Sequence, residues 1–274
     1  MKNNFGLLAA SAALGMLAYK ALSEEITLKT YNIMSGKVTK NVKIMHISDL
    51  HSSSYGKKQK ELISRIKLVC PDAVMLTGDI LDNRCPNFDG MYLLKYLSKN
   101  FPCYYVSGNH ELYTGYLDMI KETLRDMGIT VLEGNTENVI LNGQKISVSG
   151  IDDPYVFPDR NGRYWEDLLY KCEKEWDKSC FGILLTHRPE LVSYYFDTSY
   201  ELILSGHAHG GQVILPYIAN GIYAPHQGFF PKYAGGRYFL KQGQSMIVSR
   251  GLSKFVRPRV FNRPELVLIN ILPR

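Results

Sequence analysis

Five short polar clusters along the chain combine residue types that bind divalent metal ions. In chain order they are Asp49-Leu50-His51, Gly78-Asp79 with Asp82, Gly108-Asn109-His110-Glu111, His187, and Gly206-His207-Ala208-His209. Carboxylate oxygens, amide oxygens and imidazole nitrogens are ligands of manganese, iron and zinc. The clusters contain no cysteine, and the chain has no Cys-x-x-Cys pair, which argues against a structural zinc site. Because these donors exceed the needs of one ion, they favour two ions that share a bridging carboxylate.

Each cluster also has a purely structural interpretation. Asp49 could cap a helix or begin a turn, and Gly-Asp and Gly-Asn are common turn pairs. His187 could be a hydrogen-bonded core histidine, and the pair His207 and His209 could lie on a surface loop. Turns alone do not readily explain such clusters at five consecutive strand ends, so the chemical interpretation is favoured. His46 and His226 lie outside the clusters, and the sequence assigns His226 no role.

The elements that must position these clusters are alternating strands and helices. Strands are predicted at 43–48, 73–77, 103–106, 130–132, 138–141, 145–149, 182–186, 201–205, 245–249 and 266–271, and helices at 57–69, 88–100, 112–127 and 163–178. The first half therefore predicts a parallel sheet with crossover helices. The strand-rich second half favours an α/β fold that is a four-layer αββα sandwich, with two mixed sheets flanked by helices. The clusters follow strands, and the carboxyl ends of parallel strands form a common ligand crevice.

Length and charge limit the classes of function. The chain has 274 residues and a net charge of +6, with a sequence pI of about 8.9. This mild excess of positive charge is not typical of a dedicated nucleic-acid binder, but it suits phosphorylated substrates or an anionic membrane. We expect one domain over residues 24–274, because no repeat or long linker interrupts it.

Residues 1–23 are predicted to be an N-terminal membrane anchor or signal segment. Residues 5–19 are uncharged and apolar, although this stretch is short for a membrane-spanning helix. A buried helix of the domain is the alternative. The expected location is the cell membrane, through a single N-terminal anchor, or outside the cell after signal cleavage. Flanking lysines do not settle the side of the membrane.

Basic and aromatic residues near the C-terminus have two interpretations. The basic ones are Arg250, Lys254, Arg257, Arg259 and Arg263, and the aromatic ones are Tyr217, Tyr223, Phe229, Phe230, Tyr233 and Tyr238. They could form a solvated surface and ordinary packing. They could instead contact phosphate, an anionic membrane or a hydrophobic substrate.

The ordered set D-x-H, G-D-x-x-D, G-N-H-E, H and G-H-x-H resembles the calcineurin-like metallophosphoesterase superfamily, over most of residues 43–250. The tail from Ser249 to Leu252 and from Phe261 to Glu265, with the apolar N-terminus, is similar to its bacterial membrane-associated branch. That branch includes enzymes similar to UDP-2,3-diacylglucosamine pyrophosphatase. The resemblance implies that Asp49, His51 and His209 hold one metal, that Asn109, His187 and His207 hold the other, and that Asp79 bridges both.

The resemblance also implies roles beside the metals. His110 would act on the substrate, Asp82 would orient His110, and Glu111 would support the loop or cap the following helix. The cofactor would be two divalent ions, with manganese expected and iron or zinc as alternatives. Such a pair lowers the pKa of a water for in-line attack at phosphorus, while a protonated His110 assists the leaving oxygen.

The predicted function is hydrolysis of a phosphodiester or pyrophosphate bond in a lipid-linked or cell-envelope substrate. A phosphomonoesterase or nuclease with the same centre, and a non-catalytic metal-binding scaffold, are the alternatives. The expected partners are a phosphorylated small-molecule or lipid-linked substrate and a membrane; no specific nucleic acid or protein partner is indicated. The sequence identifies no substrate-binding residue.

Overall fold

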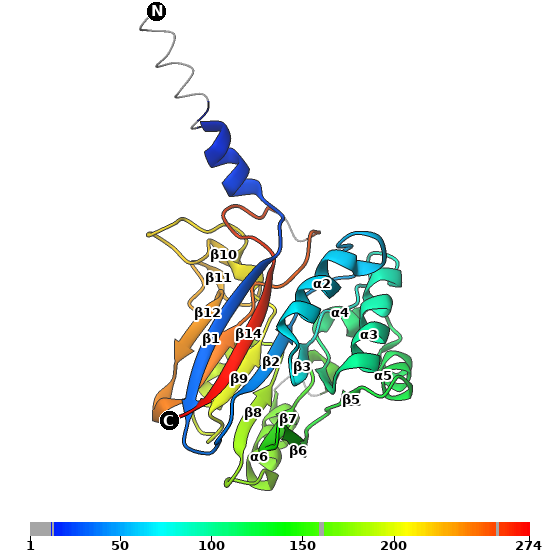
Figure 1. Ribbon diagram of the computed structural model, residues 1–274, viewed down its shortest axis with the longest axis vertical. Helices are drawn as coiled ribbons and strands as arrows, with labels where there is room; N and C mark the ends of the chain where they lie inside the picture. Colours follow the sequence, from blue (N-terminus) through cyan, green and yellow to red (C-terminus); the bar gives the residue numbers. More distant parts are fainter. Residues whose placement is uncertain (1–11, 13, 159–161, 256–257) are drawn as a thin grey trace, which may run out of the picture.

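The computed structural model describes residues 12, 14–158, 162–255 and 258–274, and they form two packed six-stranded sheets with helices outside (Figure 1). The first sheet runs in the order β1 (Thr27–Ser35), β14 (Glu265–Pro273), β2 (Val42–Ile47), β3 (Ala73–Thr77), β4 (Cys103–Val106) and β5 (Thr130–Val131). The second runs β12 (Gly236–Phe239), β13 (Ser245–Val248), β9 (Leu202–Ser205), β8 (Phe181–Leu185), β7 (Gln144–Gly150) and β6 (Asn135–Leu141). Both sheets mix parallel and antiparallel pairs, so the predicted fold class is confirmed.

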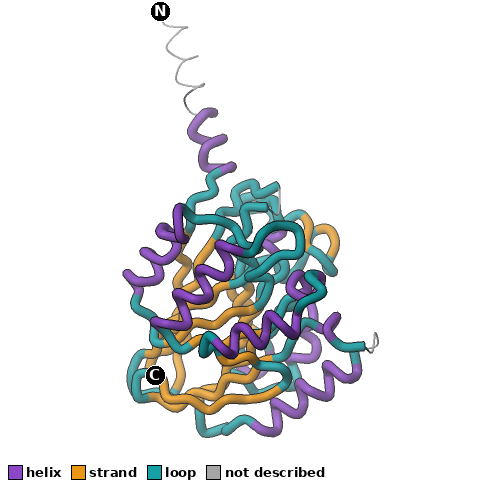
Figure 2. The backbone as a smooth tube through the Cα atoms, turned by 90° about the vertical axis from the view of Figure 1, so that its right-hand side faces the viewer, coloured by secondary structure: helices purple, strands orange, loops and turns teal. Residues whose placement is uncertain are grey.

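Helices cover the outer face of each sheet. Those on the first are α2 (Lys60–Val69), α3 (Phe88–Asn100) and α5 (Leu117–Asp126), and the described helices of the second half are α6 (Arg163–Glu175) and α7 (Val192–Tyr195). Figure 2 shows the first group lying across the strands. Helix α3 buries Leu93, Leu94 and Leu97, the apolar spacing that predicted it.

Alternating side chains divide the interior into three apolar clusters, one at each interface between layers. In β2, Met45 and Ile47 pack with the helices, whereas Ile44 packs between the two sheets. In β8, Ile183 faces the first sheet and Leu184 faces the cluster that contains residues of α6. This two-residue alternation builds the four layers.

One predicted helix needs correction, and the prediction lacked four strands that the described residues form, namely β1, β10 (Tyr223–Ala224), β11 (Gly228–Phe229) and β12. The helix predicted at 112–127 is two helices, α4 (Asn109–Tyr113) and α5, because Gly115 adopts a left-handed φ of +76° between them. Strand β1 was missed. It lies at a sheet edge, paired with β14 alone, and exposes most of its charged and polar residues, so it lacks the apolar run that marks the central strands.

The functional end of the fold follows from strand direction. Strands β2, β3 and β4 are mutually parallel, as are β7, β8 and β9. Because β14 runs antiparallel to β2 and parallel to β1, the carboxyl end of β2 lies at the same end as the start of β1. The loops that follow β2, β3 and β4 therefore lie near the point where the N-terminal segment enters the domain.

Part of the predicted anchor lies outside the described residues, namely residues 1–11 and 13. Residues 14–22 are helical and leave the domain at the end where β10 (Tyr223–Ala224) and β11 (Gly228–Phe229) lie (Figure 1). The carbonyl of Ala21 accepts the N–H of Phe261 at 2.7 Å, which ties this helix to the C-terminal loop. Within the described part of the chain, no helix has the length and apolar character needed to cross a bilayer.

Candidate metal centre

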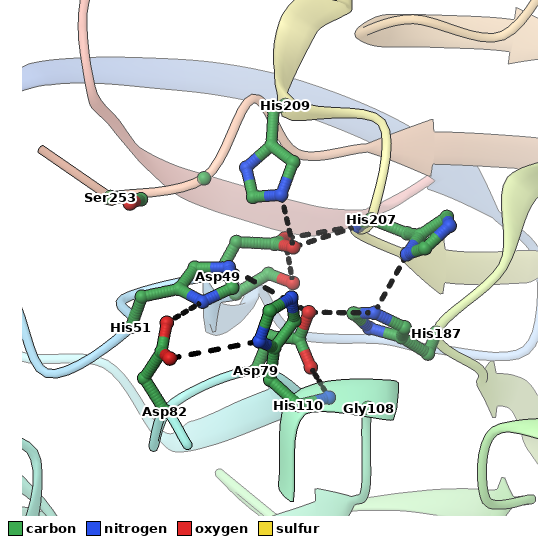
Figure 3. Close-up of polar contacts among 12 residues, drawn as sticks. Asp49, His51, Asp79, Asp82, Gly108, His110, His187, His207, His209 and Ser253 are labelled. Carbon is green, nitrogen blue, oxygen red and sulfur yellow. Dashed lines mark hydrogen bonds and ion pairs between the residues drawn. The ribbon is translucent and has the colours of Figure 1, made fainter. Parts of the chain in front are cut away.

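Six of the seven predicted ligands come together at the carboxyl ends of strands from both sheets (Figure 3). Asp49 and His51 follow β2, Asp79 follows β3, and Asn109 follows β4 at the start of α4. His187 follows β8, and His207 and His209 follow β9. Two groups of donor atoms have all members within 4.8 Å of one another: Asp49, His51, Asp79 and His209, and Asp79, His187 and His207.

Asp79 belongs to both groups, as a bridging ligand must. Its Oδ1 accepts the backbone N–H of His110 at 2.8 Å. Its Oδ2 lies 3.6 Å from Nε2 of His51 and 3.2 Å from Nε2 of His187, one histidine from each group. One carboxylate oxygen is therefore held by the protein, and the other faces both candidate metal positions.

Buried polar atoms without a hydrogen-bond partner test whether these residues fit metal ions. Among the described residues, such atoms include Asp79 Oδ2, His51 Nε2 and Asn109 Oδ1. All three belong to predicted ligands. Leaving a buried polar atom unpaired costs about 1–3 kcal/mol, so a cluster of them indicates a missing partner. The donor set is oxygen and imidazole without sulfur, which suits hard or borderline divalent ions.

Three histidines use the nitrogen that points away from the centre for a hydrogen bond. His51 Nδ1 lies 2.7 Å from Oδ2 of Asp82, and His187 Nδ1 lies 2.7 Å from the carbonyl of Thr77. His207 Nε2 lies 2.8 Å from His226. Partners of this kind fix the tautomer and the ring orientation of a metal-binding histidine. The arrangement leaves the inward nitrogens to coordinate.

Sharp backbone turns direct the side chains back into the site. Asp49, His51, Asp79, His207 and His209 all have φ between 46° and 64°, in the left-handed region that most non-glycine residues avoid. Such strain persists where the surroundings hold it, and it gathers at functional sites.

Two glycines permit the close approach of these loops. A Cβ on Gly108 would lie 2.2 Å from Oδ1 of Asp79, and one on Gly206 would lie 2.2 Å from Oδ2 of Asp49. Both distances are far inside van der Waals contact, so no side chain fits at either position. The glycines of the G-N-H-E and G-H-x-H motifs therefore let neighbouring backbone pass beside the ligand carboxylates.

Burial and neighbouring charges shift the pKa values of the carboxylates and histidines of the centre. Burial raises the pKa of Asp49. Burial acts on Asp79 in the same direction, but the charges of His187 and His51 hold its pKa well below the ordinary value. Burial lowers the pKa of His187, yet the Asp79 carboxylate outweighs burial and raises it to about 10. A proton is thus drawn to the Asp79–His187 contact, and metal binding at such a site releases protons.

His110 lies beside the two ligand groups and belongs to neither. Its ring contacts that of His51 edge-on, with centroids 4.6 Å apart. Its Nδ1 hydrogen-bonds Asn83 Oδ1 at 2.9 Å and lies 3.7 Å from Oδ1 of Asp82. Burial lowers the pKa of His110, but Asp82 and Asp79 outweigh burial and raise it. The geometry places a protonatable imidazole at the edge of the centre.

Two other side chains lie closer to Asp82 than His110 does. It contacts the metal-ligand candidate His51 at 2.7 Å, and Arg84 Nη2 at 2.7 Å. That Asp82 orients His110 stays a prediction, and the structure adds a shorter bond through which Asp82 orients His51. Asn83, which sequence reasoning missed, makes the short hydrogen bond to His110. The only indication of this role in the sequence was that Asn83 directly follows Asp82.

Glu111 connects the loops after β3 and β4. Support of the loop was one of its two predicted roles. Its Oε2 accepts the N–H groups of Asp79 at 2.8 Å and Gly108 at 3.0 Å. Its Oε1 accepts those of Ile80 at 2.7 Å and Leu81 at 3.0 Å. This fully buried carboxylate therefore fixes the loop after β3 against the loop after β4.

The basic residues near the C-terminus are engaged in contacts. Arg263 pairs with Glu25 at 2.7 Å, and Arg259 donates to the carbonyl of Arg250 at 2.8 Å. Lys254 lies over the ring of Tyr55, 4.2 Å from its centroid. Arg257 lies outside the described residues. These contacts connect the C-terminal loop to the start of β1 and to the loops around the centre.

The part of the chain that matches a known family contains all the predicted metal ligands. Residues 42–211 match the family model described as calcineurin-like phosphoesterase. An uncharacterized metallophosphoesterase of Bacillus subtilis is 31% identical, with 99% of this chain and 96% of that protein covered. An uncharacterized metallophosphoesterase of Campylobacter jejuni is 30% identical over 89% of this chain; the chain spans 63% of that relative's length, and 51% of a Caenorhabditis elegans relative.

A relative named for its substrate is the UDP-2,3-diacylglucosamine pyrophosphatase of Chlamydia muridarum, which is 25% identical, with 84% of each chain covered. Among solved structures, the phosphopantetheinyl hydrolase of Mycobacterium tuberculosis has a TM-score of 0.50 at 13% identity, covering 86% of this chain and 98% of that one. The structural likeness concerns the fold.

Proposed function

Because the chain belongs to the calcineurin-like phosphoesterase family, whose members are metal-dependent phosphoester hydrolases, we propose that it hydrolyses a phosphodiester or pyrophosphate bond in a lipid-linked substrate. The observation that carries the hydrolase chemistry is the free Oδ2 of Asp79, placed between histidines of two ligand groups. Two divalent ions held there would neutralise phosphate oxygens and activate a water for in-line attack. Manganese is the proposed metal, with iron or zinc as alternatives.

The protein's own residues would orient the substrate and supply the proton. The ligand carboxylates are fixed by backbone N–H groups: Asp79 by His110, and Asp49 by His207 at 3.0 Å. The carboxylates of Asp82 and Asp79 raise the pKa of His110, which favours the protonated ring. From the edge of the centre, that proton would pass to the oxygen that leaves when the P–O bond breaks.

A cavity beside His110 supports a substrate with an apolar leaving group. It has a volume of about 700 Å³, the scale of a small ligand, and its lining includes Leu112, Tyr113, Tyr155 and Phe157. Tyr113 stacks edge-on against His110, with centroids 5.6 Å apart. The group that leaves on the His110 side would therefore enter a space with aromatic walls.

Exposed apolar side chains at one end of the molecule support membrane association. They are Leu14, Leu17, Tyr217, Ile218, Phe229, Phe230 and Phe255. They belong to the N-terminal helix, to the loops around β10 and β11, and to the C-terminal loop. Figure 1 shows that these segments lie at the same end. Because the carboxyl end of β2 also lies there, a bilayer at this end would face the metal centre.

The rival functions predict different substrate preferences. A phosphomonoesterase or nuclease could use the same centre, because the metal ligands do not select the leaving group. The non-catalytic scaffold is disfavoured by the presence of all seven ligands together with His110. The relative from Chlamydia muridarum is named for a pyrophosphate substrate with acyl chains, which fits the cavity and the apolar end.

The test is hydrolysis by the full chain, in detergent with Mn²⁺, of UDP-2,3-diacylglucosamine, UDP-N-acetylglucosamine and p-nitrophenyl phosphate. We expect the acylated diester to have at least a tenfold higher kcat/KM than the other two. Tyr113→Ala should reduce that preference and spare the turnover of the non-acylated diester. Faster turnover of the monoester would overturn the lipid-linked substrate and leave the metal chemistry in place.

Asp79→Asn tests the metal centre itself. The variant should bind less than one equivalent of Mn²⁺ with useful affinity and lose hydrolysis, because one oxygen serves both ligand groups. Asp126→Asn, at an exposed position at the end of α5, is the matched control and should behave as wild type. Two bound equivalents and normal turnover in Asp79→Asn would refute the shared-ligand geometry.

A separate test concerns location. The full chain should sediment with membranes, and a chain without residues 1–23 should not.

A further inference from the structure

His226 lies directly behind the metal-ligand candidate His207. Nδ1 of His226 is 2.8 Å from Nε2 of His207, and the two rings are 5.0 Å apart between centroids. On its far side, Nε2 of His226 is 2.8 Å from the hydroxyl of Tyr155. The side chains of three separate loops thus form one chain of hydrogen bonds that ends at the metal centre.

The orientation of the His207 ring determines which atom donates in each hydrogen bond of the series His207–His226–Tyr155. Nδ1 of His207 lies 3.1 Å from Nε2 of His187, the nitrogen that also faces Asp79, so Nδ1 is the atom that would coordinate a metal ion. The proton of a neutral His207 then resides on Nε2, which donates to Nδ1 of His226. His226 in turn carries its proton on Nε2 and donates to the oxygen of Tyr155. Every ring nitrogen in the chain has a single compatible role.

Tyr155 is itself held firmly. The guanidinium of Arg188 lies over its ring, 4.2 Å from the centroid, and Arg188 is paired with buried Asp153 through Nε at 2.5 Å and Nη2 at 3.0 Å. Arg188 directly follows the ligand candidate His187 in the chain. The support for His226 is therefore anchored to the same loop that provides another ligand of the second group.

The backbone at His226 also points to a constrained position. Its φ is 59°, in the left-handed region shared with five of the ligand candidates. The residue lies between the short strands β10 and β11, and it is exposed. An exposed histidine in a strained turn that nevertheless contacts a buried ligand candidate is constrained by that contact.

We propose that His226, supported by Tyr155, is a positioning residue that fixes the ring of His207 and so makes the loop between β10 and β11 part of the second metal site. His226 acts through His207 and does not itself coordinate. The hairpin of β10 and β11, whose turn carries His226, also presents the exposed Phe229, with Phe230 directly after it, so metal binding and the order of this apolar hairpin are coupled.

Metal binding by the full chain, without substrate, tests the proposal. Co²⁺ is titrated into the metal-free protein, and the two sites are followed by calorimetry and by the visible absorption of bound cobalt. His226→Ala should weaken the second equivalent by about 10–100-fold, the usual effect of removing such a partner, and leave the first unchanged. Tyr155→Phe should weaken it less, because the His226–His207 bond remains.

Rescue separates this role from general damage to the loop. His226→Asn places an amide oxygen where Nδ1 accepts the bond, so it should restore affinity to within a few-fold of wild type. Phe229→Ala, an exposed change in strand β11 of the same hairpin, should leave both equivalents intact. The cobalt spectrum of the second site should change in His226→Ala and not in these two variants.

Two outcomes would overturn the proposal. His226→Ala could bind both equivalents as tightly as wild type, which would remove any positioning role. Alternatively, wild type could bind a third equivalent that His226→Ala loses, which would make His226 a ligand of a separate site with Glu190 and His207, whose donor atoms lie within 4.8 Å of one another. Because the readout is metal binding alone, neither outcome depends on which substrate the enzyme hydrolyses.

Discussion

Replacing Glu111 with glutamine should destabilise the protein far more than the small change in shape suggests. The carboxylate is fully buried and accepts four backbone N–H groups, two on each oxygen. Glutamine has one acceptor oxygen and presents an amide NH₂ in place of the other. If its oxygen keeps Ile80 and Leu81, the N–H groups of Asp79 and Gly108 face a donor instead of an acceptor.

The size of the effect follows from those two lost bonds. A buried donor left without a partner costs about 1–3 kcal/mol, so two of them reduce the free energy of unfolding by about 2–6 kcal/mol. Both orphaned groups lie at the centre, one of them on Asp79, the candidate bridging ligand. Metal affinity should therefore fall together with stability.

The assay is urea unfolding followed by circular dichroism, in chelator so that metal binding does not contribute. Burial raises the pKa of Glu111 to about 7, so pH 8 keeps the wild-type carboxylate ionised. Glu122→Gln, an exposed change on α5, is the control and should alter stability by less than about 0.5 kcal/mol. A Glu111→Gln variant within about 1 kcal/mol of wild type would refute the assignment of Glu111 as the joint between the two loops.

Three further predictions concern other residues in and behind the centre. His110→Ala should keep its metals and lose about 10²–10⁴-fold in kcat, the usual size of acid–base assistance; loss of metal by elemental analysis would contradict this role. Asp82→Asn should weaken metal binding about 10–100-fold, because the bond that orients His51 loses its charge, and unchanged affinity by titration would contradict it. Burial lowers the pKa of His46 from 6.5 to about 3, so the folded state binds fewer protons than the unfolded state between those values. Stability should therefore fall as pH drops below 6.5, by up to about 1.4 kcal/mol per pH unit, and His46→Gln, measured in chelator, should lack this part of the slope.

The layer order and the convergence of the site could be predicted because both follow from local patterns. Buried strands such as β3 and β4 appear as short apolar runs, and each is followed by the polar residue that the parallel arrangement brings to the shared edge. Helix α3 was predictable from its spacing of leucines. These signals depend only on residues close together in the sequence.

The contacts that support the site could not be predicted in the same way. His226 meets His207 across 19 residues, and Tyr155 meets His226 across 71, through loops whose paths no periodic pattern encodes. A lone histidine in a loop carries no signal until its partner is placed. Strand β1 was missed because it lies at a sheet edge and exposes most of its charged and polar residues, so it has no apolar run to indicate it.

The ligand loops and their supports form one mechanical unit, which explains how a strained site persists. The left-handed turns at Asp49, Asp79 and His207 each cost free energy on their own. The Asp79 carboxylate accepts the N–H of His110, and the Asp49 carboxylate accepts the N–H of His207, so each turn is held by the loop that supplies another ligand. Glu111 adds the bond between the loops after β3 and β4. Because each ligand loop is braced by a neighbouring ligand loop, the donor atoms are positioned before any ion binds, and the free energy of metal binding need not be spent on ordering them.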